Sequence, residues 1–178
     1  MIRCITQKLR RFRAHDDGNA SVEFAIVIPA FLLALMSTVE LGLINLRHSQ
    51  LERALDLTVR DIRLNTGANK DHAQIRDEIC ELSGFIDDCA SSLKLEMVRA
   101  DPFNWTGIDP DPDCINRIEE VNPDVTFEHG QSNELMLIRA CMKFKPILPT
   151  WGLGQSLSKD DDGRISLTAA SAFVQEPR

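Results

Sequence analysis

The sequence lacks the short motifs through which many enzymes bind phosphate, dinucleotides or zinc. It contains no G-x-S-x-G, no P-loop, no H-E-x-x-H and no dinucleotide-binding fingerprint. None of its four histidines has a second histidine or a cysteine at metal-ligand spacing: His15, His48, His72 and His129. The sequence therefore predicts no enzyme, no cofactor and no metal centre.

A basic surface for nucleic acid is also missing. The chain has 20 basic and 27 acidic residues, and five of the basic ones lie within residues 1–18. The rest of the chain is strongly acidic, which excludes nucleic acid as a partner because phosphates require a basic face. With 178 residues, 43% of them apolar, the chain has room for one compact domain and a membrane segment.

Charge is absent from Phe24 to Val39, and up to Ile44 the only charged residue is Glu40. Such a stretch extends roughly 30 Å as a helix and spans a bilayer. Because the preceding residues are basic, the positive-inside rule places residues 1–18 in the cytoplasm and the chain after residue 45 across the membrane.

Three interpretations fit this stretch. A cleaved secretory signal would release a soluble protein, even a secreted enzyme, beginning near residue 38 to 43, but no A-x-A-like site follows the apolar core. An uncleaved signal anchor would hold a periplasmic ligand-binding or sensory domain. In the third, a peptidase at the cytoplasmic face cuts the flexible Gly18-Asn19 bond.

Glu23 is the unusual residue of the stretch. A charged carboxylate near the middle of the bilayer costs on the order of 2.5 to 3.5 kcal/mol. Cleavage at Gly18 would place the new ammonium of Asn19 about one helical turn away, where it could pair with Glu23 of its own or a neighbouring chain.

These residues resemble the TadE-like minor pilins, or pseudopilins, of the tight-adherence (Flp) type IV pilus machinery. The resemblance is carried by Gly18, Val22-Glu23-Phe24-Ala25, Pro29 and Val39-Glu40-Leu41-Gly42. It departs from the family at Asn19 and Ser21, where the family often has alanine. It implies a pilin-like fold, cleavage between Gly18 and Asn19 by a prepilin peptidase, and an assembly role for Glu23 and Phe24.

The implied partners are the prepilin peptidase, other minor pilins, the major pilin and inner-membrane platform proteins. The expected organisation is a cytoplasmic leader at 1–18, a transmembrane segment at 19–45 and a periplasmic or extracellular domain at 46–178. The protein would be a single-pass inner-membrane protein that can enter the pilus. Pro29 is expected to kink the helix, and Glu40 to lie at the outer headgroups.

Beyond the membrane, apolar residues at helical spacing predict that one helix runs from about Ala20 to Leu64: Ile44, Leu51, Leu55, Val59 and Ile62. Its outer half is expected to pack on its own domain. A second helix is predicted from Asp71 to Leu82, with Ile75, Ile79 and Leu82 on its buried face.

Three strand-like runs follow: 93–98, 135–144 and 165–173. The second is apolar on both faces and is the predicted central strand. The fold class is therefore α+β, with a long helix laid on a small antiparallel sheet of about three strands, one short helix and disulfides.

Cys4 lies alone on the cytoplasmic side, while the exported part has an even set of four cysteines, which allow three connectivities. Cys80 and Cys89 are close enough in sequence to join the second helix to the turn before the first strand. A bridge from Cys114 to Cys141 would anchor the long loop at 101–130 to the central strand. We predict these two pairs.

Two acidic runs are candidates for calcium sites. In Asp109-Pro110-Asp111-Pro112-Asp113, prolines replace the flexible positions of a calcium loop. Asp160-Asp161-Asp162-Gly163 has consecutive carboxylates, which cannot all converge on one ion without bending, and is predicted to be a solvated turn.

Overall fold

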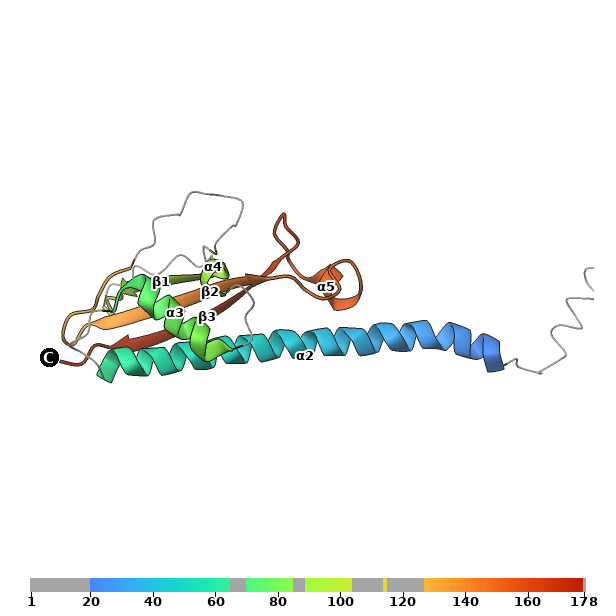
Figure 1. The fold of residues 1–178 in the computed structure, drawn as a ribbon, viewed down its shortest axis with the longest axis horizontal. Helices are drawn as coiled ribbons and strands as arrows, with labels where there is room; N and C mark the ends of the chain where they lie inside the picture. The colour runs from blue at the N-terminus through green and yellow to red at the C-terminus, as the bar shows by residue number, and fades with distance from the viewer. Residues whose placement is uncertain (1–19, 65–69, 85–88, 104–113, 115–126, 178) are drawn as a thin grey trace, which may run out of the picture. The chain divides into compact units, whose positions relative to one another are not determined.

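The computed structural model describes residues 20–64, 70–84, 89–103, 114 and 127–177. In chain order the elements are α2 (Ala20–Leu64), α3 (His72–Ser83), α4 (Cys89–Ser92), β1 (Leu93–Arg99), β2 (Leu135–Phe144), α5 (Gly152–Ser156) and β3 (Ile165–Val174) (Figure 1). The chain divides into two compact units, residues 1–39 and 40–178. The predicted α+β class is confirmed.

The long helix α2 has the bounds that its sequence predicts. Within residues 51–64 the buried positions form one stripe at helical spacing: Leu51, Ala54, Leu55, Thr58 and Val59. Leu51 and Leu55 are almost completely inaccessible, as expected of the apolar face of an amphipathic helix that packs on a core. The outer half of α2 is thus part of the C-terminal unit.

Helix α3 begins and ends with strong local signals. The carboxylate of Asp71 accepts a hydrogen bond from the backbone N–H of Gln74 at 2.8 Å. The side chain of Gln74 accepts one from the N–H of Asp71 at 3.0 Å. This reciprocal capping box fixes the first turn, and Gly84, with φ of +60°, ends the helix in the left-handed conformation that glycine favours.

The buried face of α3 differs from the predicted one at a single position. Ile75 and Ile79 are buried as expected, but Leu82 is 43% exposed. Ser83 is buried instead, and its hydroxyl donates to the carbonyl oxygen of Cys80 at 3.1 Å. The reason is geometric: residues four apart lie on the same face, so the face of Ile75 and Ile79 continues to position 83.

The three strands form one antiparallel sheet in the order β1-β2-β3, which confirms β2 as the central strand. Leu93 lies opposite Met142 in the β1–β2 pair, and Phe144 opposite Ile165 in the β2–β3 pair. In β1, the alternate residues Leu93, Leu95 and Met97 are buried on the core side, and Lys94 between them is buried as well.

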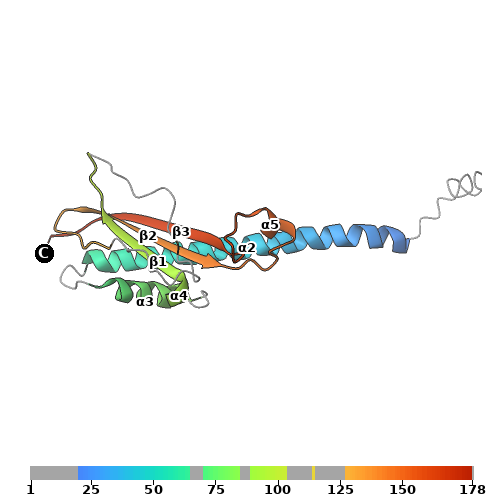
Figure 2. The same cartoon turned by 90° about the horizontal axis from the view of Figure 1, so that it is seen from above.

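The core lies between the sheet and helices α2 and α3, which run side by side (Figure 2). Its strand residues are Leu93, Leu95, Met97, Met136, Ile138, Ala140, Met142, Ala169 and Phe173. On the outward face of the sheet, Arg139 donates to its cross-strand neighbour Glu96 at 2.8 Å. Opposite charges at facing positions stabilise the register of the strands.

Lys70 links the end of α2 to α3. Its ammonium contacts the carboxylate of Asp61 on α2 and that of Glu78 on α3, the latter at 2.6 Å. Hydrogen bonds to Asp61 and then Glu78 raise the pKa of Lys70 above its ordinary value. The ammonium therefore holds two negatively charged helix surfaces next to each other.

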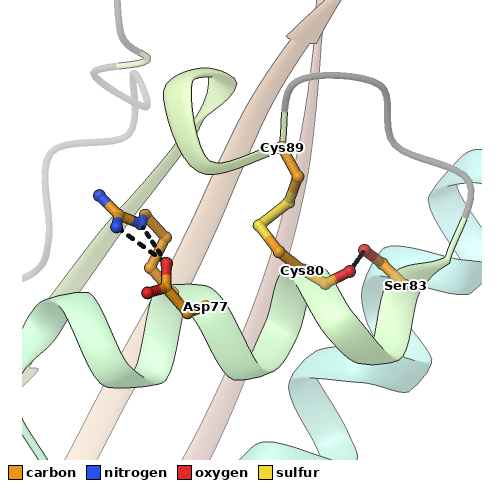
Figure 3. The surroundings of a disulfide bond; sticks show 5 residues. Asp77, Cys80, Ser83 and Cys89 are labelled. Carbon is orange, nitrogen blue, oxygen red and sulfur yellow. Dashed lines mark hydrogen bonds and ion pairs between the residues drawn. A yellow bond between two sulfur atoms is a disulfide. The ribbon is translucent and has the colours of Figure 1, made fainter.

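The cysteines pair as predicted from the sequence. Cys80 on α3 is bonded to Cys89 at the start of α4, with 5.6 Å between their Cα atoms (Figure 3). Cys114 is bonded to Cys141 on β2, with a Cα separation of 5.4 Å. Most of the predicted loop at 101–130, including Asp109 to Asp113, lies outside the described residues, but Cys114 ties it to the central strand.

We expect the bridge that closes the longer loop to contribute more stability. In the chain-entropy model, sequence separations of 9 and 27 residues correspond to about 2.6 and about 3.5 kcal/mol. Replacing Cys114 and Cys141 with serine should therefore lower the free energy of unfolding more than replacing Cys80 and Cys89. Denaturant unfolding of the two double variants tests this, and the opposite order would contradict it.

Candidate functional site

The predicted cleavage residues Gly18 and Asn19 lie outside the described residues, which begin two positions after Gly18. Glu23 lies in the first turn of α2 and is exposed. No described residue forms an ion pair with it. A carboxylate in the first turn of a helix is favourable because it faces the positive end of the helix dipole.

The inner half of α2 has an apolar surface on all sides. Its large apolar side chains are between 41% and 71% exposed: Val22, Phe24, Ile26, Val27, Phe31, Leu32, Leu33, Leu35, Met36 and Val39. Within the described residues, α2 is the helix that is long and apolar enough to cross a membrane. A helix that is apolar all round needs an apolar surrounding, so this half fits a single-pass membrane anchor.

Pro29 lies inside this helix, which continues on both sides of it. A proline has no backbone N–H, so the carbonyl of Ala25 loses its usual partner. In a membrane helix, neighbouring helices or water can satisfy that carbonyl. The kink remains a prediction.

Glu40, which is expected at the outer headgroups, is enclosed by its own domain. Its side chain is only 2% exposed. One carboxylate oxygen accepts the backbone N–H of Leu148 at 3.0 Å, and the other accepts that of Gly154 at 3.2 Å. A segment more than 100 residues away in the sequence folds over the carboxylate and replaces water as its hydrogen-bond donor. The level of Glu40 relative to the headgroups stays a prediction.

The segment at 145–157 that receives Glu40 fits closely around it. A Cβ atom on Gly154 would lie 2.1 Å from the carbonyl oxygen of Leu148, so only glycine allows this approach. Lys159 donates to the carbonyl oxygens of Pro149 at 2.6 Å and Gly154 at 2.5 Å. We call this segment, with Glu40 bound to it, the Glu40 loop.

Glu23, Pro29 and Glu40 thus lie on one helix, α2. Its inner half is apolar, and its outer half belongs to a folded domain. Residues 18–60 match the family model of TadE-like proteins. The resemblance predicted from the sequence is confirmed over this segment. No curated protein and no solved structure is significantly similar to the chain.

The TadE-like segment contains Gly18, Glu23, Pro29 and Glu40 and extends to Arg60 on the outer half of α2. The hydrogen bonds of Glu40 give one residue of this segment a structural role. Sequence reasoning missed that role, because a separation of 108 residues between Glu40 and Leu148 leaves no periodic signal.

The acidic turn at residues 160–163, just before β3, is organised by its own hydrogen bonds. Asp160 accepts the backbone N–H groups of Asp162 at 3.1 Å and Arg164 at 2.7 Å, and pairs with Lys143 at 3.2 Å. Burial alone would raise the pKa of Asp160, but the N–H of Arg164 and the ammonium of Lys143 lower it below its ordinary value. Asp160 therefore shapes the turn before β3.

The histidines in the described part of the chain also have structural contacts. A ring nitrogen of His48 contacts the carbonyl oxygen of Thr168 at 3.1 Å. The rings of His72 and His129 both lie edge-on to Phe127, with centroids 5.5 Å away. Among the residues that the structure describes, no group of three His, Cys, Asp or Glu side chains could hold a metal ion.

Two glycine substitutions in the same protein should have opposite effects. Gly154→Ala should destabilise by about 1 to 3 kcal/mol, because the new methyl group collides with backbone that cannot move away cheaply. Gly42→Ala meets no atom within 4 Å and should stabilise α2 by about 0.5 to 1 kcal/mol. Denaturation of the detergent-solubilised protein measures both, and equal effects would contradict the close fit of the Glu40 loop.

Proposed function

We propose that the protein is a minor pilin, or pseudopilin, that is needed for assembly of a tight-adherence type IV pilus. The observation that carries this proposal is the TadE-like match, which begins at Gly18 and covers the membrane-length half of α2 together with part of its domain-bound half. A structural component needs no catalytic centre, and its function lies in how it packs with other subunits.

In this proposal the basic leader directs insertion into the inner membrane, and a prepilin peptidase cuts between Gly18 and Asn19. The new ammonium of Asn19 and the carboxylate of Glu23 then pair, within one chain or between neighbouring chains. Pairing compensates the cost of placing a carboxylate in an apolar environment. Phe24, which is 64% exposed, would contact a neighbouring helix beside this pair.

The domain after residue 45 would lie in the periplasm or, after assembly, in the extracellular pilus. Its two disulfides suit an oxidising compartment. The partners would be the prepilin peptidase, the major pilin, other minor pilins and the inner-membrane platform. The long helix packed by its outer half on an antiparallel sheet is an arrangement that a pilin-like subunit requires.

The cleavage site can be tested directly. In cells with an active prepilin peptidase, the membrane-extracted protein should begin at Asn19, because the enzyme removes residues 1–18. Intact-mass analysis measures this. A chain that still begins at Met1 would contradict the proposal and favour an uncleaved signal anchor.

The charge of Glu23 should matter for assembly and not for insertion. Glu23→Gln removes a costly charge from the membrane segment, so the protein should insert as well as the wild type or better. Pilus assembly should fall, since the ammonium of Asn19 loses its partner. Membrane fractionation and quantification of surface pili measure the two effects.

Glu52→Gln is a matched control on the same helix. The side chain of Glu52 is 56% exposed and only 3.7 Å from His48 in a solvent-facing pair, which contributes little. This variant should assemble normally. Wild-type assembly of Glu23→Gln, or an equal defect in both variants, would show that Glu23 has no specific role.

A further inference from the structure

The Glu40 loop exposes two large apolar side chains beside the point where it is attached to α2. Trp151 is 64% exposed and Ile147 is 57% exposed. They lie on either side of Leu148, Pro149 and Thr150 in the sequence. The loop is held by the N–H of Leu148, next to Ile147, and by the N–H of Gly154, three residues after Trp151, which both donate to the same carboxylate. A tryptophan in such a fixed loop has a defined position.

The position of Glu40 sets the level of this loop along α2. Residues 20–39 give roughly 30 Å of helix, which matches the hydrocarbon thickness of a bilayer. Glu40 is the next residue and the first charged one after Phe24. The carboxylate that holds the loop therefore lies where the helix leaves the hydrocarbon on the exported side.

Tryptophan is enriched at this depth of membrane proteins because its ring is apolar while its indole N–H needs a polar partner. Lys145, also exposed, can extend its ammonium towards headgroup phosphates from the start of the loop. The side chains that the loop presents are thus those that suit the boundary between headgroups and acyl chains.

We propose that the Glu40 loop is a second membrane contact, in which Trp151 and Ile147 enter the headgroup region of the outer leaflet of the inner membrane. Glu40 is the positioning residue, because its two backbone hydrogen bonds hold the loop at that level. The domain is then fixed against the membrane surface at two points instead of one. This contact requires the membrane span but neither cleavage at Gly18 nor pilus assembly.

The environment of Trp151 can be measured by fluorescence in the full chain. The protein has two tryptophans, so Trp105→Phe leaves Trp151 as the single reporter. The variant is reconstituted into phosphatidylcholine vesicles, and its insertion is checked by flotation. Lipid brominated near the headgroup end of the acyl chains should quench Trp151, and iodide in the water should quench it weakly.

Phe103 provides a matched control. It is 98% exposed and follows β1, whose last residue Arg99 pairs with Met136 at the start of β2. The Glu40 loop follows the opposite end of β2. A variant with Phe103→Trp, Trp105→Phe and Trp151→Phe should show the reverse result, with strong quenching by iodide and none by brominated lipid.

Three results would overturn the proposal. Quenching of Trp151 by iodide, at the level of the control, would place the loop in water. Protection from both quenchers would mean that protein, such as a second copy of the chain, covers the tryptophan. Failure of the chain to float with vesicles would overturn it as well, because the membrane span is then missing.

Glu40→Ala tests the positioning role separately. The two N–H groups lose their acceptor while the core residues stay unchanged, so quenching of Trp151 by brominated lipid should fall towards that of the control. Unchanged quenching in this variant would show that Glu40 does not position the loop. An uncleaved chain would give the same expected results, so failure of the proposed function is distinguishable from failure of this contact.

Discussion

Burial of one stripe of α2 against the sheet is the interaction on which the rest of the domain depends. Leu51 and Leu55 are inaccessible at the centre of the core, and each fully buried leucine stabilises by about 1.5 to 3 kcal/mol. The stripe covers the same sheet face as Ile75 and Ile79 of α3. Without it, the three-stranded sheet would expose a continuous apolar surface to water, which is unfavourable.

The same helix links this core to an apolar segment, and Glu40 lies where the two meet. Its carboxylate is buried, and a buried charged group needs hydrogen-bond donors. Two backbone N–H groups meet that need, which also fixes a loop of otherwise irregular backbone. The Glu40 loop, the ion pairs of Lys70 and two disulfides hold peripheral segments to a small core. Such attachments matter most in small domains, whose cores supply limited stability.

The long, strongly periodic elements were predictable. The extent of α2 follows from the uncharged run in its inner half and from apolar spacing in its outer half, and the start of α3 follows from Asp71. The strands follow from alternation, with β2 central because both its faces are apolar. Less predictable were α4 and α5, since four and five residues are too few for a period. Leu82 was misplaced because a single serine at position 83 occupied the buried face instead.

For the candidate site, the residues whose chemistry is local could be found without a structure: the small residues at Gly18 and Asn19, the charge at Glu23 and the uncharged length up to Val39. The roles proposed for these residues depend on residues adjacent to them in the sequence, so no knowledge of distant contacts is needed. The environment of Glu40 and the close approach of Gly154 to Leu148 became known only from the fold. Those contacts involve backbone groups far apart in the sequence. Because almost every residue has the same backbone N–H, the residue type does not indicate which acceptor that N–H will bind.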